Sequence, residues 1–270
     1  MTRGSLWRGF FIGFFLLYLL IPLLATVAFS FAQRWDRSIL PEGLTLEWWI
    51  AVVGRRAFSS ALQHTLVVSL ATMVTSILLV TPTAYWVHLR APRAKPWVEL
   101  MTILPFGIPG VVLALALIRT YARFGGGVVY SPAMLIMACV VISLPFVYRP
   151  IATALSSVDV RTLTEAAQTL GAGWFTILRR IIIPNIMPGI ISGGLLVFSL
   201  VFVEFTLANL LVGARYKTFP IYLVEFTRFD GRQASALAVM SFVIAWLTSL
   251  GLIWVAGRAG GSREEAIGAR

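Results

Sequence analysis

The sequence predicts an all-α integral membrane protein with six transmembrane helices. Apolar residues make up 59% of the 270 residues and charged residues only 12%, whereas soluble domains are about 45–50% apolar and about a quarter charged. Six stretches with almost no charge are each long enough to cross a bilayer, which takes about 20 residues. The segments between them leave no room for a separate soluble domain.

The spans are expected in a single transmembrane domain that covers residues 1–270. Their predicted ranges are about 9–32, 60–87, 98–118, 131–155, 185–210 and 233–257. The first stretch is far longer than the apolar region of a signal peptide, so we expect it to be a retained helix. An even number of spans places both termini on one side. The basic residues divide 12 to 10 between the two sides, which does not settle the orientation.

Proline occurs repeatedly inside the predicted spans. Two stretches share one pattern, Pro105-x-x-x-Pro109-Gly110 and Pro184-x-x-x-Pro188-Gly189. Each proline removes a backbone donor and bends its helix. We therefore expect both stretches to begin bent helices that pack against other helices of the protein, where the freed carbonyls find partners.

Composition and residue spacing exclude several classes of function. The net charge of +11 comes from basic residues between the apolar runs, where headgroup contacts explain them better than nucleic acid does. The single Cys139 and the two histidines show no metal-ligand spacing. Neither Lys95 nor Lys217 follows a glycine, so the chain has no phosphate-binding loop. We expect no catalytic site, no cofactor bound by this chain and no nucleic-acid partner.

The segment between the fourth and fifth spans, residues 159–184, carries the clearest functional signal. Thr162 and Glu165 have the spacing of a capping box, which predicts the start of a short helix. Gly171 and Gly173 are expected to end it. The segment thus reads as helix, glycine turn and helix.

The short helix would carry a small, flat apolar face made by Ala166, Ala167 and Leu170. Small residues permit a close approach to another protein, and Glu165 can accept a bidentate arginine. An ordinary juxtamembrane amphipathic loop is the alternative interpretation of these features.

The same residues resemble a known family. Glu165-Ala166-Ala167, then Gly171, Ile181 and Pro184, match the loop pattern of permease subunits of binding-protein-dependent type I ABC importers, with Ile183 where the pattern has leucine. The Leu104-Pro105 to Gly110 stretch and Glu204-Phe205 are also similar to permeases for polyamines, iron and phosphonates. The resemblance covers most of the chain from about residue 60 onward.

The resemblance implies a set of partners and an orientation. Such a permease pairs with a second permease, here expected to be a different chain, on a dimer of ATPase subunits that bind ATP and Mg²⁺. An external binding protein delivers the solute. The loop at about residues 159–184 forms the coupling helix, so this loop and both termini would be cytoplasmic, in the inner membrane of a bacterium. The residues assigned to coupling are Glu165, Ala166, Ala167, Leu170, Gly171 and Gly173.

One ionisable residue lies inside the fifth predicted span. Glu204 is expected near its outer end, with Asn209 on nearly the same helical face. Such a residue points to a translocation path or gate, although pairing with Arg119 or Arg123, or simple exposure at the membrane interface, would also explain it. A polyamine, an aminophosphonate or ferric iron would suit one carboxylate. An ion-coupled secondary transporter that uses Glu204 is the alternative function.

Overall fold

The computed structural model describes residues 3–36 and 40–268, and nearly all of them are helical. The chain divides into two compact units. The first comprises residues 1–60 and 222–244, and the second comprises residues 61–221 and 245–270. The single-domain assignment and its span limits stay predictions.

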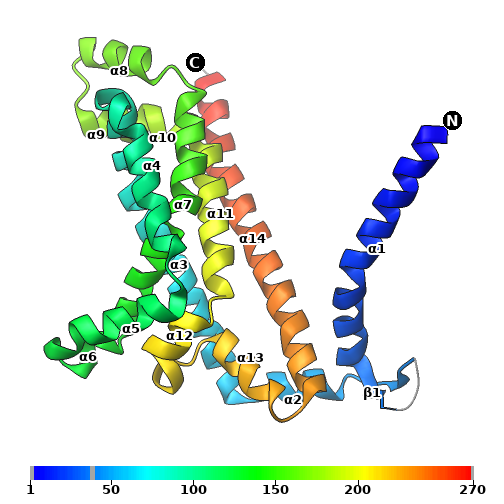
Figure 1. Ribbon diagram of the computed structural model, residues 1–270. Helices are drawn as coiled ribbons and strands as arrows, with labels where there is room; N and C mark the ends of the chain where they lie inside the picture. Colours follow the sequence, from blue (N-terminus) through cyan, green and yellow to red (C-terminus); the bar gives the residue numbers. More distant parts are fainter. Residues whose placement is uncertain (1–2, 37–39, 269–270) are drawn as a thin grey trace. The chain divides into compact units, whose positions relative to one another are not determined.

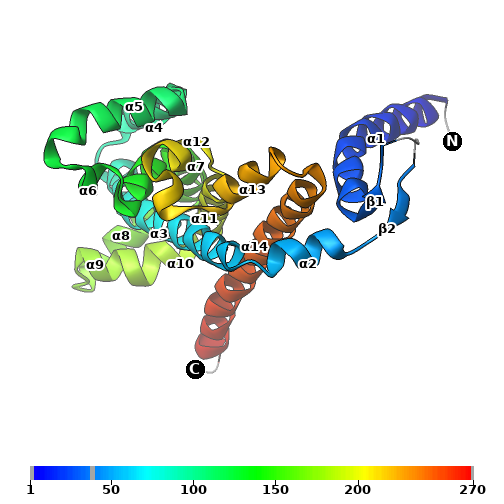
Figure 2. The same cartoon turned by 90° about the horizontal axis from the view of Figure 1, so that it is seen from below.

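The first unit is built around α1 (Arg3–Phe31), which leads into a two-stranded antiparallel sheet (Figure 2). In this sheet β1 (Ala32–Arg34) pairs with β2 (Glu42–Leu44), so that Ala32 lies opposite Leu44. The short helix α2 (Glu47–Val53) follows. The indole nitrogens of Trp48 and Trp49 donate to the carbonyl oxygens of Ala32 and Ser30 at 2.9 and 3.2 Å. These bonds attach α2 to the end of α1.

The second unit contains most of the remaining helices (Figure 1). Two long helices, Arg56–Arg90 and Gly231–Gly268, have residues in both units. The helices are α3 (Arg56–Arg90), α4 (Lys95–Ile103), α5 (Gly110–Tyr121), α6 (Gly126–Val129), α7 (Pro132–Ser156), α8 (Val160–Thr169), α9 (Trp174–Ile177), α10 (Ile183–Asn185), α11 (Met187–Phe202), α12 (Thr206–Leu211), α13 (Phe219–Thr227) and α14 (Gly231–Gly268). Short 3-10 turns and one π-helical turn, Leu178–Ile182, join several of them.

Within residues 3–36 and 40–268, four helices are long and apolar enough to cross a membrane, namely α1, α3, α7 and α14. Two bent pairs bring the number to six if each pair is one span. The first pair, Pro92–Gly107 with Gly110–Phe124, bends by 91°, and the second, Trp174–Asn185 with Met187–Phe202, bends by 79°. Both bends fall at the two Pro-x-x-x-Pro-Gly stretches, as the sequence predicts, because proline removes the donor that would continue the helix.

Two expected spans are not continuous helices. The third, expected over residues 98–118, is broken by its bend between Gly107 and Gly110. The fifth, expected over residues 185–210, ends as α11 at Phe202 and resumes as α12 at Thr206. The bend inside the third span is the one that the Pro105-x-x-x-Pro109-Gly110 stretch predicts, whereas no proline or glycine in the sequence predicts the break after Phe202.

The core of the second unit lies where α7 and α11 pack side by side (Figure 1). Glycines make this contact close. A Cβ atom on Gly189 would lie 2.6 Å from both the Pro150 carbonyl oxygen and the Ala154 Cβ, and one on Gly193 would lie 3.2 Å from the Val147 backbone. Small residues in this way let two membrane helices approach at the level of their backbones.

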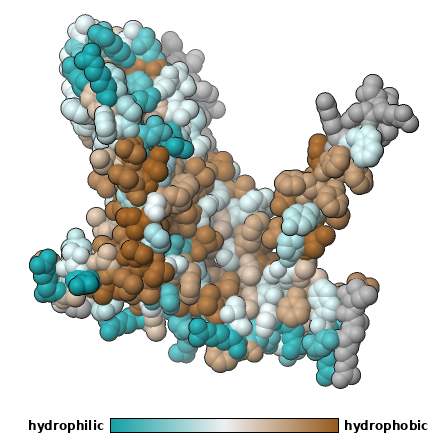
Figure 3. Space-filling view, in the orientation of Figure 1, coloured by the Kyte–Doolittle hydropathy of each residue, from teal (hydrophilic) through white to brown (hydrophobic). Residues whose placement is uncertain are grey.

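The surface is apolar where a soluble protein would be polar. Side chains along α1 such as Phe10, Phe14 and Leu17 are about 60% exposed. In the second unit, hydrophobic residues cover the middle of the visible face, whereas hydrophilic residues gather at the end that carries α8 and α9 (Figure 3). Lipid is the solvent that this distribution fits.

Candidate functional site

The start of α8 is fixed by an aspartate. The Asp159 carboxylate accepts hydrogen bonds from the Thr162 backbone nitrogen at 3.2 Å and the Thr162 hydroxyl at 2.7 Å. The capping box expected from Thr162 and Glu165 is therefore wrong, because the helix begins earlier, at Val160. An aspartate, with two acceptor oxygens on a short side chain, is among the preferred residues at this position.

Charged groups interact locally along α8. The hydrogen bonds from Thr162 hold the pKa of the Asp159 carboxyl below its usual value. The Glu165 carboxylate accepts from Arg161 Nε at 2.8 Å, one turn earlier, and this bond raises the pKa of the Arg161 guanidinium. Both members of the pair are largely exposed, so the pair adds little to stability and leaves Glu165 accessible to a partner.

The two glycines after α8 have different roles. Gly171 has a φ of +79°, the left-handed conformation that glycine adopts without strain, and it ends the helix as predicted. Gly173 has a φ of −75° and instead precedes the first residue of α9. The expectation that both glycines end the helix is thus correct for Gly171 alone.

The apolar side chains of α8 divide between two faces. Ala167 is buried against the second unit's own core, while Ala166 is exposed and Leu170 is 88% exposed. Thr164 fixes this orientation, since its hydroxyl lies 3.0 Å from the Tyr85 hydroxyl of α3. The flat face expected from Ala166, Ala167 and Leu170 is therefore not one surface.

Sequence reasoning missed part of the exposed surface at this end. Trp174 and Phe175, at the start of α9, are 50% and 65% exposed, whereas Ile177 and Leu178 are buried. A spacing of three residues places Trp174 and Ile177 near one face of a helix, yet only Ile177 is buried. Two exposed aromatic residues in sequence, next to a glycine turn, are the signal that points to this surface.

The helix α12 lies at the opposite end of α7 and α11 from α8 (Figure 1), and Glu204 and Asn209 lie just before it and on it. Glu204 falls in the break between α11 and α12, where one carboxylate oxygen accepts from the Leu207 backbone nitrogen at 2.8 Å. Asn209 lies on α12 itself and is exposed. Because the helix is broken before α12, the two residues do not share a helical face as expected.

Glu204 forms no ion pair with Arg119 or Arg123 among the described residues, and its side chain is partly exposed. Arg123 instead donates from Nε to the Thr120 carbonyl oxygen at 3.3 Å and lies over the Phe124 ring.

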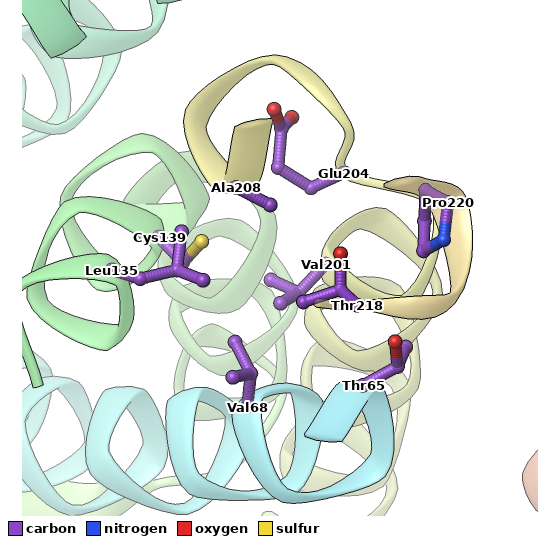
Figure 4. A pocket seen from close by; sticks show the side chains of 9 residues that line it. All are labelled: Thr65, Val68, Leu135, Cys139, Val201, Glu204, Ala208, Thr218 and Pro220. Atoms are coloured by element: carbon purple, nitrogen blue, oxygen red, sulfur yellow. The ribbon is translucent and has the colours of Figure 1, made fainter. Parts of the chain in front are cut away.

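A small crevice lies beside Glu204, with a volume of about 10 Å³ (Figure 4). Thr65 of α3, Cys139 of α7 and Thr218, which precedes α13, also line it. The Thr65 hydroxyl accepts from the Phe219 backbone nitrogen at 2.7 Å. The Thr218 hydroxyl is buried and has no hydrogen-bond partner in the described part of the chain.

The segment over this crevice is attached to the end of α3. His64 Nδ1 lies 2.9 Å from the Lys217 carbonyl oxygen, so this nitrogen carries the proton and donates. The His64 ring stacks on Tyr216 with ring centroids 3.8 Å apart. Burial raises the pKa of the Tyr216 phenol.

Residues 81–259 match the model of a protein family described as binding-protein-dependent transport system inner membrane components. The chain belongs to this family. It is a permease subunit of a binding-protein-dependent ABC importer, as the sequence resemblance implied.

Relatives of this permease include the spermidine/putrescine transport system permease protein PotC of Escherichia coli K12, which is 29% identical over 244 residues, 90% of each chain. The spermidine/putrescine transport system permease protein PotB of the same organism is 28% identical over 223 residues, which are 76% of this chain and 79% of PotB. PotC of Haemophilus influenzae is 27% identical over 84% of this chain and 88% of its own.

Solved structures confirm the fold. A chain of a bacterial ABC transporter that imports the acidic polysaccharide alginate superposes with a TM-score of 0.72 at 18% identity, over 92% of this permease and 95% of that chain. A chain of a bacterial alginate transporter in complex with a pentasaccharide-bound periplasmic protein gives 0.74 at 17% identity, over 96% of both chains. The all-α importer permease fold is thus confirmed, with four to six candidate membrane spans among the described residues, and the location of the termini stays a prediction.

Proposed function

We propose that this permease forms half of the path for a small amine-bearing solute and is driven by a separate ATPase that docks on α8. One observation carries the coupling proposal. A capped, surface-exposed helix presents Glu165 and Ala166 at one end of the membrane-crossing helices, in a chain of this family. ATP and Mg²⁺ would bind the ATPase dimer, and this chain would bind no cofactor.

The local geometry supports a docking role for α8. Thr164 and Ala167 attach one face of the helix to the permease, so that a push on its exposed face reaches α3 and the core. The exposed face carries the Glu165 carboxylate beside Ala166, which is small enough for close approach. Leu170, in the turn that follows, extends this face with exposed apolar surface.

The relatives favour a polyamine over the other solutes considered. PotC and PotB are named as permease proteins of a spermidine/putrescine system, and a polyamine carries the positive charge that Glu204 would attract. No relative considered above supports ferric iron or an aminophosphonate in the same way.

The remaining partners follow from the family and its members. An external binding protein would deliver the solute, and a second, unlike permease would complete the path, since E. coli K12 has two different spermidine/putrescine transport system permease proteins that are similar to this chain. We assign the chain to a bacterial inner membrane, with α8 and both termini on the cytoplasmic side.

Co-purification from cells that also express the chromosomal neighbours tests the coupling proposal. We expect an ATPase and a second permease to purify with the tagged wild-type chain, and the ATPase to be lost from Glu165→Arg. The double variant Arg161→Glu with Glu165→Arg is the matched control, because it restores an ion pair within α8 but moves the carboxylate. Retention of the ATPase by Glu165→Arg would contradict the proposal, and rescue by the double variant would show that the single variant only disturbs the helix.

A further inference from the structure

The crevice beside Glu204 has the electrostatic character of a cation site. Glu204 is the only charged residue among the nine described residues that line it. The chain as a whole carries a net charge of +11, so a negative lining is not a consequence of overall composition. An ionisable group at membrane depth is costly unless it has a partner, and the Glu204 carboxylate has one hydrogen bond, to Leu207, in the described part of the chain.

The Thr218 hydroxyl is the second, independent observation. Thr218 is 3% exposed, and its hydroxyl oxygen has no hydrogen-bond partner. A threonine hydroxyl buried without a partner is unfavourable by comparison with an apolar side chain of the same shape. In Figure 4 this oxygen points toward the side of the crevice on which Glu204 lies. A ligand with hydrogen-bond donors would satisfy it.

A helix end adds negative potential at the same place. The helix α11 runs for 16 residues and ends at Phe202, two residues before Glu204. The carboxyl end of a helix carries a partial negative charge and favours a cation within its last turn. Interrupted helices with irregular backbone at membrane depth occur where they line a cavity or are buried in protein, and such breaks form ion and substrate sites in transporters.

The size and the acceptors of the crevice specify the ligand group. A volume of about 10 Å³ holds one water-sized group. A primary ammonium group is of this size and has three donors. Three acceptors line the crevice from separate elements, since the Thr65 hydroxyl that accepts from Phe219 has a second lone pair. A trimethylated ammonium would be too large and would have no donor.

We propose that this crevice is a binding site for one primary ammonium group of the solute, held by Glu204, Thr218 and Thr65. The proposal rests on the proposed function for the source of the ammonium group. In Figure 4 the Glu204 carboxylate points away from Thr65 and Thr218. Binding would turn it from the backbone of Leu207 toward the ammonium, so the cap on the six-residue α12 would be exchanged for an ion pair.

Equilibrium binding of a defined diamine tests the site. The full chain, with its co-purifying partners but without the binding protein, is placed in discs of phosphatidylcholine, a lipid that has no primary ammonium group. Radiolabelled 1,4-diaminobutane is the probe. We expect saturable binding that unlabelled 1,4-diaminobutane displaces, and that neither 1,4-butanediol nor the bis(trimethylammonium) analogue displaces. Absence of saturable binding, or equal displacement by the diol, would overturn the proposal.

Two variants assign the binding to the crevice. We expect Thr218→Val to raise the Kd about tenfold and Glu204→Gln about a hundredfold, as for the loss of hydrogen bonds to a charged group. Thr218→Val replaces a hydroxyl that has no partner, so its thermal stability should equal that of the wild type, which separates binding from folding. Thr83→Val removes an exposed hydroxyl outside the crevice and is the control. Wild-type affinity in both crevice variants would overturn the proposal.

The two proposals can fail separately. If an ATPase purifies with the wild-type chain but the diamine does not bind, the ammonium site is wrong and the coupling role stands. If no ATPase purifies with the chain, the proposed function is wrong, and binding by the chain alone still tests the crevice.

Discussion

At the α8 end of the second unit, helices α7 and α11 are packed at backbone distance, whereas at the α12 end the same pair borders a crevice. Gly189, near the start of α11, leaves no space for a methyl group against Pro150 and Ala154. Near the other end, Val201 lines a crevice beside a broken helix, and the Thr218 hydroxyl is buried without a partner.

This difference in packing suits the two ends of α11 to different roles. Close packing resists deformation, because a well-packed interior has few voids and transmits displacement. A push on α8 would therefore move the adjoining part of α7 and α11 as one body. The α12 end instead has an irregular backbone and an unsatisfied hydroxyl, and segments that move when a ligand binds are drawn from the less stable parts of a structure.

The largest expected effect is at the close contact. Gly189→Ala places a methyl group 2.6 Å from the Pro150 carbonyl oxygen, and neither backbone can yield without separating α7 from α11. We expect the free energy of unfolding to fall by about 3 kcal/mol. Gly194→Ala is the control, since its methyl group would meet the flexible ends of Ile77 and Met73 at 3.1 and 3.4 Å, at a cost below about 1 kcal/mol. Unfolding by SDS in bicelles measures the free energy of unfolding of both variants. Equal losses of stability in Gly189→Ala and Gly194→Ala would contradict the prediction.

A smaller effect on the free energy of unfolding is expected at the crevice, where one threonine hydroxyl has a hydrogen-bond partner and the other has none. Thr65→Val leaves the buried Phe219 N–H without its 2.7 Å acceptor, which should cost about 2 kcal/mol. Thr218→Val removes a hydroxyl that has no partner, so stability should change by less than about 0.5 kcal/mol. The same unfolding assay compares them. A loss in Thr218→Val as large as in Thr65→Val would mean that Thr218 has a structural role.

The sequence predicted what depends on local chemistry. The two Pro-x-x-x-Pro-Gly stretches locate both bends, and Gly171 ends α8, because proline and glycine act on the backbone directly. The family pattern around Glu165 is enough to indicate an importer permease. Composition alone indicates only a membrane protein.

What the sequence could not predict depends on residues far apart in the chain. The crevice joins Thr65 of α3 to Thr218, which are separated by 153 positions, and no periodicity relates them. The break after Phe202 was missed because the apolar run continues unchanged through Val203. The capping error was local, since Asp159 and Thr162 both suit the start of a helix and only the hydrogen bonds distinguish them.

The turn after α8 contains two glycines, Gly171 and Gly173, that differ in backbone conformation. Gly171→Ala forces a side chain into a left-handed conformation at a φ of +79°, with no atom within 4 Å, so the cost is purely conformational and should be about 1 kcal/mol. Gly173→Ala has an ordinary φ of −75° and should be close to neutral. Faster amide exchange in α8 of the Gly171 variant alone would support this, whereas equal exchange in the two variants would contradict it.

The smallest expected effect is a pH dependence confined to α8. Hydrogen bonds from Thr162 lower the pKa of the Asp159 carboxyl in the folded helix, so the charged form is favoured there more than in the unfolded chain. The cap therefore contributes stability above the usual aspartate pKa of 3.8, and this contribution is lost as the pH falls through the lowered pKa. Amide protection in the first turn of α8, corrected for intrinsic exchange, should decline over that window in the wild type. Asp159→Asn keeps an acceptor for the Thr162 N–H but does not titrate, so its protection should be flat with pH. A parallel decline in this variant would mean that another group controls the start of α8.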